Sequence, residues 1–133
     1  MVKKAERRLY VFSNGTIIAV YPIALGRNPV GPKVFVGDGR TPEGRYVIES
    51  RNENSDFYRA LKISYPNEEN KEIARQYGIP PGGQIMIHGQ PNRNRPDLDT
   101  NSDWTEGCIA VTNRQMDELW RTVKTGTPIN ILP

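Results

Sequence analysis

The stretch RLYVFSNGTIIAVYP, residues 8–22, shows the character of the fold most clearly. At its centre lies Asn14-Gly15, and Asn-Gly is the strongest short signal for a β-hairpin because both residues tolerate positive φ. The flanking runs, residues 8–12 and 16–21, have the composition of strands. The pattern therefore predicts an antiparallel hairpin near the start of the chain.

Short strands separated by turn signals are predicted along the rest of the chain. Apolar and polar side chains alternate in several segments, and a period of two is typical of a strand. Clusters of Gly, Pro, Asn and Asp between the segments indicate turns. The expected strands are Lys33–Val36, Arg45–Glu49, Leu61–Tyr65, Gln84–His88, Ile109–Val111 and Pro128–Leu132.

Two helices are expected, one weakly and one clearly indicated. The weaker helix covers residues 67–77, with an Asn as its N-cap and Gly78 as its stop. The clearer helix follows Thr112, which forms a capping-box pattern with Gln115, and it ends at Gly126. Its apolar residues recur at i, i+3, i+4 and i+7 and are expected in the core: Met116, Leu119, Trp120 and Val123.

Together these elements predict a mainly β fold, with a sandwich or barrel-like core and one clear and one weaker helix. The length of 133 residues suits a single domain, residues 1–133. A chain of this size buries roughly two-thirds of its unfolded surface, which is enough for one core without disulfide or metal staples. No internal repeat and no linker divides the sequence.

Charge and composition exclude several functional classes. The net charge of +3 is mild, and the basic residues form no long block. The cluster Lys3, Lys4, Arg7 and Arg8 is expected to be a solvated end of the chain. RNP-like aromatic runs, zinc-ligand spacings and phosphate loops are absent, so no nucleic-acid partner is expected. A modest positive charge also suits a substrate rich in carboxylates.

The single cysteine and the single histidine set further limits. One cysteine excludes an internal disulfide, and one Cys with one His cannot complete a four-ligand zinc site, so no metal and no other cofactor is expected. No apolar stretch approaches the roughly 20 residues of a membrane span. The N-terminus lacks the apolar core of a signal peptide, which indicates either a cytoplasmic protein or a removed signal.

Cys108 and His88 lie where two predicted strands adjoin one long polar loop. His88 closes a strand just before Gly89, and Cys108 follows Gly107 and opens the next strand. Such a loop brings its ends together at modest entropic cost, so neighbouring strands would place the thiol and the imidazole close together. The imidazole could then take the thiol proton, and the amides of Gly107 and Cys108 could face a developing oxyanion.

Each of these two residues also has an ordinary structural interpretation. A lone Cys is among the most often buried residues, and most such cysteines are inert packing. A lone His at the end of a strand is more often a surface or hydrogen-bonded residue than a base. The catalytic interpretation therefore needs support from a wider pattern.

Several ordered motifs supply that support. The runs DWTEGCIAVTN (103–113) and IMIHG (85–89) resemble the signature of L,D-transpeptidases of the YkuD/ErfK type. In that signature a His-Gly pair begins a loop that ends in Ser or Thr, one variable residue, Gly and Cys. The other matching segments are LGRNPVGPK (25–33), GDGRTPEGRYVI (37–48), ISYPN (63–67) and PGG (81–83). The resemblance is strongest to the murein-transpeptidase branch and spans nearly the whole chain, from about Leu9 to Leu132.

The resemblance implies a cysteine peptidyltransferase acting on peptidoglycan stem peptides. Cys108 would form a thioester with the L-centre of a diamino acid, usually meso-diaminopimelate. An amine acceptor would resolve the thioester to a 3→3 cross-link or to an attached wall-linked protein. His88 matches the family's base, and the carbonyl of Gly89 would orient its ring. Thr105, Gly107 and Cys108 match the pocket that holds the oxyanion.

Two positions depart from the family's pattern. Glu106 stands where many members carry a second His directly before the Gly-Cys pair, and Ala110 stands where many carry Arg. Substrate contacts of that Arg are therefore not carried over to this chain. Trp104, Arg93 and Arg95 lie in the predicted active-site loop, and the hypothesis from their position and type is that they hold stem-peptide carboxylates.

Other functions stay open on the sequence. The same class of bond is hydrolysed by L,D-carboxypeptidases or by amidases that release wall-bound protein, and the water exclusion of the acceptor groove decides between amine and water. A non-catalytic wall-binding module would keep the fold without needing the cysteine. Papain-like and caspase-like protease signatures are absent. Because peptidoglycan lies outside the inner membrane, the expected location is the periplasm or cell envelope.

Overall fold

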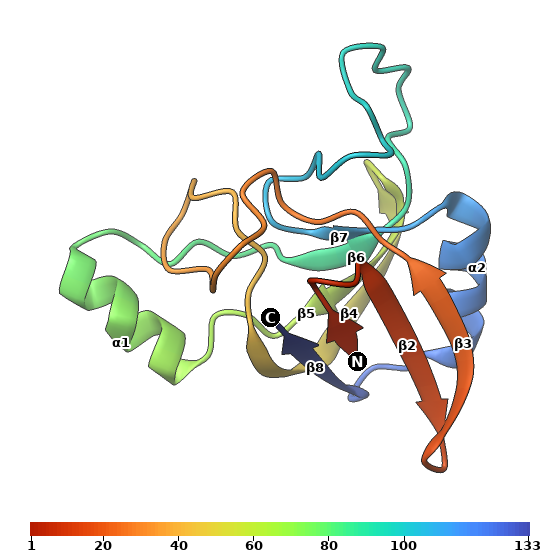
Figure 1. Cartoon of the computed structure of the whole chain (residues 1–133), viewed down its shortest axis with the longest axis horizontal. Coiled ribbons are helices and arrows are strands. Elements are labelled where there is room, and N and C mark those ends of the chain that lie inside the picture. Colours follow the sequence, from red (N-terminus) through yellow and green to blue (C-terminus); the bar gives the residue numbers. More distant parts are fainter.

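An eight-stranded sheet forms the body of the protein in the computed structural model, which describes residues 1–133. Neighbouring strands follow the order β3-β2-β1-β8-β4-β5-β6-β7, accompanied by two helices (Figure 1). The strands are β1 (Val2–Lys3), β2 (Arg8–Ser13), β3 (Thr16–Pro22), β4 (Gly44–Ser55), β5 (Tyr58–Ile63), β6 (Met86–His88), β7 (Ile109–Ala110) and β8 (Pro128–Leu132). The predicted mainly β fold with two helices is confirmed.

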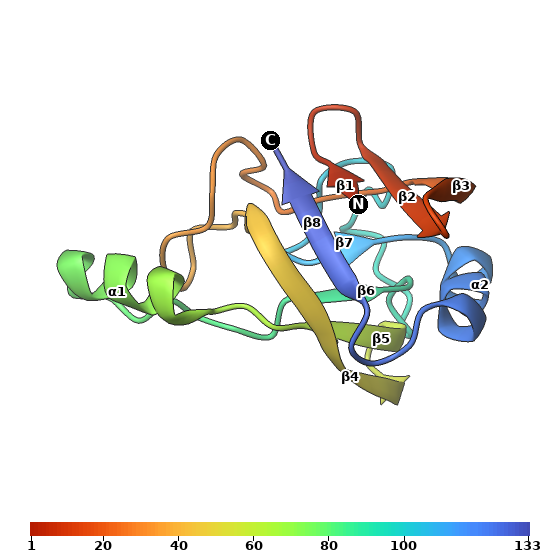
Figure 2. The same cartoon turned by 90° about the horizontal axis from the view of Figure 1, so that it is seen from below.

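The sheet curls until its two ends approach each other. After β3 the chain runs past β7, where Ala24 forms an antiparallel bridge to Ala110, and Gly26 forms a parallel bridge to Thr105. In Figure 2, β4 and β8 run steeply across the layer that contains β5 and β6. A cluster of 18 buried hydrophobic residues forms the core. The core is therefore barrel-like, and the curl places the segment after β3 beside the chain that leads into β7.

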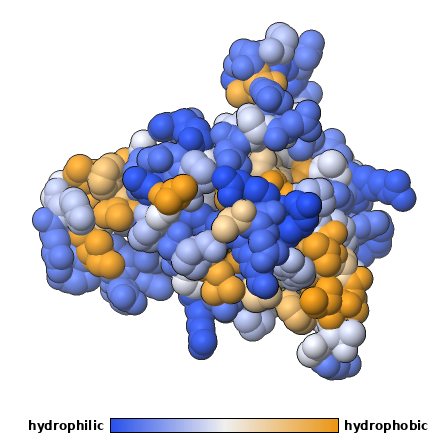
Figure 3. All heavy atoms as spheres, viewed as in Figure 1, coloured by the Kyte–Doolittle hydropathy of each residue, from blue (hydrophilic) through white to orange (hydrophobic).

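The hairpin predicted from Asn14-Gly15 is present as β2 and β3. Asn14 and Gly15 have φ values of 51° and 78°, as a two-residue turn of this type requires. Several of its apolar side chains are exposed and form the orange patch at the lower right of Figure 3. They are Phe12, Ile17, Ile18 and Val20.

The β4–β5 hairpin is longer than the sequence pattern predicted. The strand expected at Leu61–Tyr65 instead begins at Tyr58 and ends at Ile63, and β4 continues to Ser55. The two strands pair antiparallel, with irregularities in register near the turn. This turn carries Phe57 toward the end of β6, because β6 pairs with β5 along its other edge.

The weaker helix is α1, Glu68–Tyr77. The Asn67 side chain accepts the N–H of Asn70, and the Asn70 side chain accepts the N–H of Asn67. The N-cap predicted at Asn67 is therefore confirmed, and so is the stop predicted at Gly78, which has the left-handed conformation. Ala74 is the buried residue of the helix. α1 extends to the side of the sheet in Figure 1.

The clearer helix is α2, Asn113–Thr122, with the predicted capping box between Thr112 and Gln115. Met116 and Leu119 are buried in the core, as predicted. The helix ends at Thr122 rather than at Gly126, because its C-cap, Val123, already has the extended conformation of a segment that leads into β8. Neither helix combines the length and apolar character that crossing a membrane would require.

The segment Lys33–Val36, predicted as a strand, is a loop. The Asp38 carboxylate accepts the N–H of Arg40 and two N–H groups within the segment at 2.8–3.1 Å, so these donors are not available to a sheet. The same carboxylate pairs with the Lys33 ammonium at 2.8 Å, and both side chains are buried. Local side-chain hydrogen bonds therefore replace the expected strand ladder.

The N-terminal basic cluster, predicted to be a solvated end, is partly built into the fold. The Lys4 side chain is only 3% exposed. Its ammonium donates to the carbonyl oxygens of Gly31 and Thr41 at 2.9 and 2.7 Å and to the Glu43 carboxylate at 3.0 Å. These acceptors compensate the desolvation of the charge, and they tie the start of the chain to the loop before β4.

Replacing Lys4 by Ala is expected to lower the free energy of unfolding by about 3 kcal/mol, because the Glu43 carboxylate and two carbonyl groups lose their shared donor. Urea unfolding of the wild type and Lys4→Ala measures the difference. Lys3→Ala is the matched control, since the Lys3 side chain is 38% exposed, and it should change stability by less than about 0.5 kcal/mol. Equal losses in the two variants would contradict the structural role of Lys4.

Candidate active site

Parallel pairing of β6 with β7 brings the two candidate catalytic residues together. Ile87 lies opposite Ile109, and His88 lies opposite Ala110, so these two strands are neighbours, as an approach of the thiol to the imidazole requires. His88 and Cys108 both line one cavity of about 240 Å³. The other residues that line it are Phe57, Arg95, Leu98, Trp104, Thr105 and Glu106.

The loop between β6 and β7 is anchored at both ends, and its middle projects from the body of the protein (Figure 1). At the near end, Asn92 accepts the N–H of Tyr58 at 3.0 Å. At the far end, the Asp103 carboxylate accepts from the Arg7 guanidinium at 2.9–3.2 Å and from the N–H of Leu25 at 3.0 Å. These bonds fix the two ends of the loop beside the cavity, while its tip stays exposed.

His88 is held in one orientation by burial and by the backbone. Its side chain is almost fully buried, and Nδ1 lies 2.8 Å from the carbonyl oxygen of Gly89. Because a carbonyl only accepts, the ring proton is assigned to Nδ1, and Nε2 keeps its lone pair. Burial lowers the pKa of His88, although hydrogen bonds with the backbone of Gly89 and His88 partly oppose this effect. His88 is therefore a neutral imidazole at neutral pH.

Two aromatic rings pack beside the imidazole. The Phe57 ring stacks on it with centroids 4.4 Å apart and an interplanar angle of 19°, and the Trp104 ring lies 5.7 Å from both. The Trp104 indole N–H is buried without an acceptor. Trp104 was among the predicted residues, whereas Phe57 was missed. It sits in a hairpin turn, and no local pattern in the sequence indicates which strand end that turn meets.

Cys108 carries a protonated thiol in this arrangement. Its Sγ donates to the carbonyl oxygen of Gln84 at 3.3 Å. Burial raises the pKa of the thiol, while a hydrogen bond from the Met86 backbone and the charge of Lys33 partly oppose the shift. The resting pair is therefore a neutral thiol and a neutral imidazole, and the proton would move only when sulfur attacks.

The turn before Cys108 depends on Gly107. Its φ is 138°, and a Cβ atom there would lie 2.7 Å from the carbonyl oxygen of Arg40. Its N–H donates to Oγ1 of Thr105 at 3.1 Å, and the Thr105 hydroxyl in turn donates to the Cys108 carbonyl at 2.6 Å. The Gly107 amide is thus already engaged, which leaves the N–H of Cys108 as the backbone donor beside the thiol.

One basic and one acidic side chain line the cavity. Arg95 lines it and forms two hydrogen bonds with Asp97 at 3.0 and 2.8 Å, while Arg93 is exposed and lies outside the lining. Glu106, the residue in place of a second His, also lines the cavity and pairs with Arg27 at 3.1 Å. Nowhere do three His, Cys, Asp or Glu side chains converge as ligands of a metal ion would.

This combination of a curled sheet and a Cys-His cavity is that of an L,D-transpeptidase catalytic domain. The family model of that domain, YkuD, matches residues 1–131, and the chain belongs to this family. Its relative YafK of Escherichia coli K12 is 34% identical over 106 residues, which cover 77% of this chain and 36% of YafK. YqjB of Bacillus subtilis 168 is 27% identical over 132 residues, which cover 98% of this chain and 69% of YqjB.

Solved structures show the same fold. Pgp2 of Campylobacter jejuni, a helical cell shape determining protein, has a TM-score of 0.73 and 26% identity, with 98% of this chain and 45% of Pgp2 covered. Bd1075 of Bdellovibrio bacteriovorus has a TM-score of 0.65 and 28% identity, with 98% of this chain and 46% of Bd1075 covered. The chain thus spans about a third of YafK and less than half of these two solved proteins.

The rate at which iodoacetamide alkylates Cys108 is expected to keep rising above about pH 9, because the raised thiol pKa delays formation of the reactive thiolate. Intact-mass time courses across the pH range measure this rate, with N-acetylcysteine as the reference thiol. The protein's curve should lie on the alkaline side of the reference. A plateau reached below about pH 7 would instead indicate a preformed thiolate–imidazolium pair and contradict the neutral resting state.

The substitution Gly107→Ala is expected to destabilise the protein by about 2–4 kcal/mol, because it combines a positive φ with a clash against the Arg40 carbonyl. Gly37→Ala is the matched control. Gly37 also has positive φ (83°), yet no atom lies within 4 Å of a Cβ built there, so only about 1 kcal/mol should be lost. Thermal unfolding compares them, and similar losses would show that close packing around Gly107 contributes little.

Proposed function

We propose that this protein is an L,D-transpeptidase that acts on peptidoglycan stem peptides through a thioester at Cys108. The observation that best supports this proposal is that His88 and Cys108 line one cavity. The His88 ring is held there by a hydrogen bond between its Nδ1 and the Gly89 carbonyl. That hydrogen bond performs the orienting task of a third triad member, and it leaves Nε2 as the basic nitrogen. Membership of the family supports the same chemistry.

In the proposed acylation step, Nε2 of His88 takes the Sγ proton as sulfur attacks the carbonyl carbon at the L-centre of the diamino acid. The negative charge that develops on the carbonyl oxygen is stabilised by the N–H of Cys108. Thr105 and Gly107 act by holding this turn in shape rather than by donating to the oxyanion. When the C–N bond breaks, the imidazolium returns the proton to the departing amine of the terminal D-residue.

The thioester is then resolved by a second nucleophile. His88 takes a proton from the acceptor amine as the amine attacks the thioester carbon. The C–S bond then breaks, and the imidazolium returns that proton to the sulfur of Cys108. A stem-peptide amine gives a 3→3 cross-link, and an amine of a wall protein gives an attached protein. Water in the same role would make the enzyme an L,D-carboxypeptidase or an amidase.

Substrate binding is proposed to use the walls of the cavity. Trp104 and Phe57 provide apolar surface beside His88 and lie close to each other. Arg95 would exchange its exposed pair with Asp97 for a stem carboxylate, which costs little because exposed ion pairs are weak. Arg93 would contact a carboxylate only from the exposed part of the loop. Since the substrate lies outside the inner membrane, the proposed location is the periplasm or cell envelope.

Incubation with a purified disaccharide-tetrapeptide, followed by intact-mass measurement, tests the proposal. The wild type is expected to gain one acyl adduct and to release the terminal D-residue, because the thioester forms before the acceptor arrives. Cys108→Ala should show neither. His88→Ala should be slowed by at least about 100-fold, since a positioned general base contributes that much or more. Adding an acceptor amine and identifying the small products distinguishes amine transfer from hydrolysis.

Circular dichroism spectra and binding of the unlabelled fragment serve as controls for folding of both variants. A folded wild type that binds the fragment yet forms no adduct and no product would overturn the proposal and favour a non-catalytic wall-binding module. An adduct that persists in Cys108→Ala would place the nucleophile elsewhere.

A further inference from the structure

The turn between β4 and β5 is hydrogen-bonded to the end of the strand that carries His88. The N–H of Gly89 donates to the carbonyl oxygen of Phe57 at 2.9 Å. The carbonyl oxygen of Gly89 lies 2.8 Å from Nδ1 of His88 and accepts its proton. One residue therefore fixes both the backbone of Phe57 and the orientation of the imidazole.

Asn92 holds the same turn from the start of the loop after β6. Its N–H donates to the carbonyl oxygen of Asp56 at 3.0 Å, and its side-chain amide donates to the carbonyl oxygen of Ser55 at 2.8 Å. Its side-chain oxygen accepts the N–H of Tyr58 at 3.0 Å. Because the residues on both sides of Phe57 are held in this way, its ring has a fixed position beside the end of β6.

Tyr58, the residue after Phe57, has a left-handed backbone with a φ of 74°. A bulky residue rarely adopts this conformation, which persists where the surrounding structure holds it in place. The Tyr58 hydroxyl donates to the Asp117 carboxylate at 2.7 Å. A Cβ atom at Gly89 would lie 3.0 Å from Cβ of Tyr58 and would overlap Oδ1 of Asn113. The turn thus packs against the end of β6 as closely as a glycine permits.

The Phe57 ring presents its face to the imidazole. Its centroid lies 4.4 Å from that of His88 and the two planes are 19° apart, whereas the Trp104 ring is tilted by 54° from the imidazole. The face of an aromatic ring carries negative potential and attracts a cation within about 6 Å of its centroid. This attraction favours the charged imidazolium over the neutral imidazole.

No carboxylate pairs with His88, because the charged side chains around it are paired with one another. These pairs are Arg95–Asp97 and Arg27–Glu106 at the cavity, and Arg59–Asp117 between β5 and α2. The remaining titratable group of the cavity is the Cys108 thiol. The His88 side chain is 3% exposed, and burial lowers its pKa. An imidazolium at this position therefore depends on neutral neighbours for its stabilisation.

We propose that Phe57 is a positioning residue that supports His88 as the base, with the face of its ring stabilising the imidazolium formed when Cys108 gives up its proton. This role rests on the proposed function, since there the proton leaves Sγ for Nε2 as sulfur bonds to the carbonyl carbon. The stacked ring offsets part of the cost of a buried positive charge. His88 can then be neutral at rest and still accept a proton in the transition state.

Titration of His88 by NMR tests this role without a substrate. The chain has one histidine, so the ring resonances are unambiguous. The substitution Phe57→Leu keeps an apolar side chain but removes the ring face, and it is expected to lower the pKa of His88 by at least about 0.5. Phe57→Tyr keeps the ring face and should stay within about 0.2 of the wild type. Entry of water alone would have the opposite sign, because it would raise the pKa of His88.

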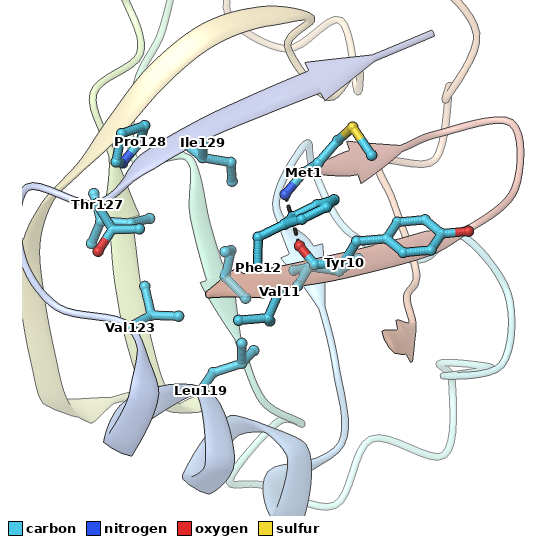
Figure 4. Close-up of a pocket in the computed structure, with 12 residues that line it drawn as sticks. Met1, Tyr10, Val11, Phe12, Leu119, Val123, Thr127, Pro128 and Ile129 are labelled. Atoms are coloured by element: carbon cyan, nitrogen blue, oxygen red, sulfur yellow. Dashed lines mark hydrogen bonds between the residues drawn. The ribbon is translucent and has the colours of Figure 1, made fainter. Parts of the chain in front are cut away.

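Phe12→Leu is the matched control, because it makes the same chemical change away from the imidazole. Phe12 lines a separate apolar cavity of about 260 Å³ between β2, β8 and α2 (Figure 4). That cavity shares no lining residue with the cavity of His88 and Cys108. Phe12→Leu should therefore leave the pKa of His88 unchanged. Phe57→Met is a second variant without a ring at this position, and circular dichroism establishes which variants are folded and enter the comparison.

The rate of adduct formation with the disaccharide-tetrapeptide supplies the second measurement. Phe57→Leu should acylate at least about threefold more slowly than the wild type, and Phe57→Tyr should restore most of the rate. An unchanged or raised pKa of His88 in the folded variants without a ring would overturn the proposal, since Phe57 would then act only by excluding water. A lowered pKa in Phe57→Leu, beside a wild type that forms no adduct, would overturn the proposed function yet support stabilisation of the imidazolium by Phe57.

Discussion

The parallel pairing of β6 with β7 is the interaction on which the candidate site depends. It aligns His88 with Ala110, so the cysteine just before β7 enters the cavity that His88 also lines. A parallel pair needs a crossover, and here a long polar loop without a helix supplies it. Such a loop gains little from burial, which explains why both of its ends are held by hydrogen bonds that the side chains of Asn92 and Asp103 accept.

Buried and half-buried polar contacts hold three segments outside the sheet. Lys4 holds the loop before β4, the Lys33–Asp38 pair shapes the loop after β3, and Arg7 holds Asp103. Each ion has several hydrogen-bond partners, which is the condition for burying charge without a large loss of stability. Because loops bury little apolar surface, their positions depend on these contacts rather than on hydrophobic packing.

Much of the fold was predictable because local rules governed it. Asn14-Gly15 sets a hairpin turn, and the capping boxes at Asn67 and Thr112 begin helices wherever the rest of the chain lies. The strand predicted at Lys33–Val36 was wrong because the Asp38 carboxylate, just past the segment, accepts two of its N–H groups and pairs with the Lys33 ammonium. The solvated end predicted around Lys4 was wrong because its acceptors lie 27 to 39 residues away.

The sequence by itself determined which groups are available for chemistry: one thiol, one imidazole, and the motifs around them that place the chain in its family. It also determined the period-two strands and the helix caps, since these depend on neighbours a few residues apart. Tertiary structure alone decided that Phe57 stacks on His88, that the Gly107 amide is engaged by Thr105, and that burial holds both candidate catalytic groups neutral. Those properties arise from contacts between distant segments and from exclusion of water, and neither is encoded in any short stretch of residues.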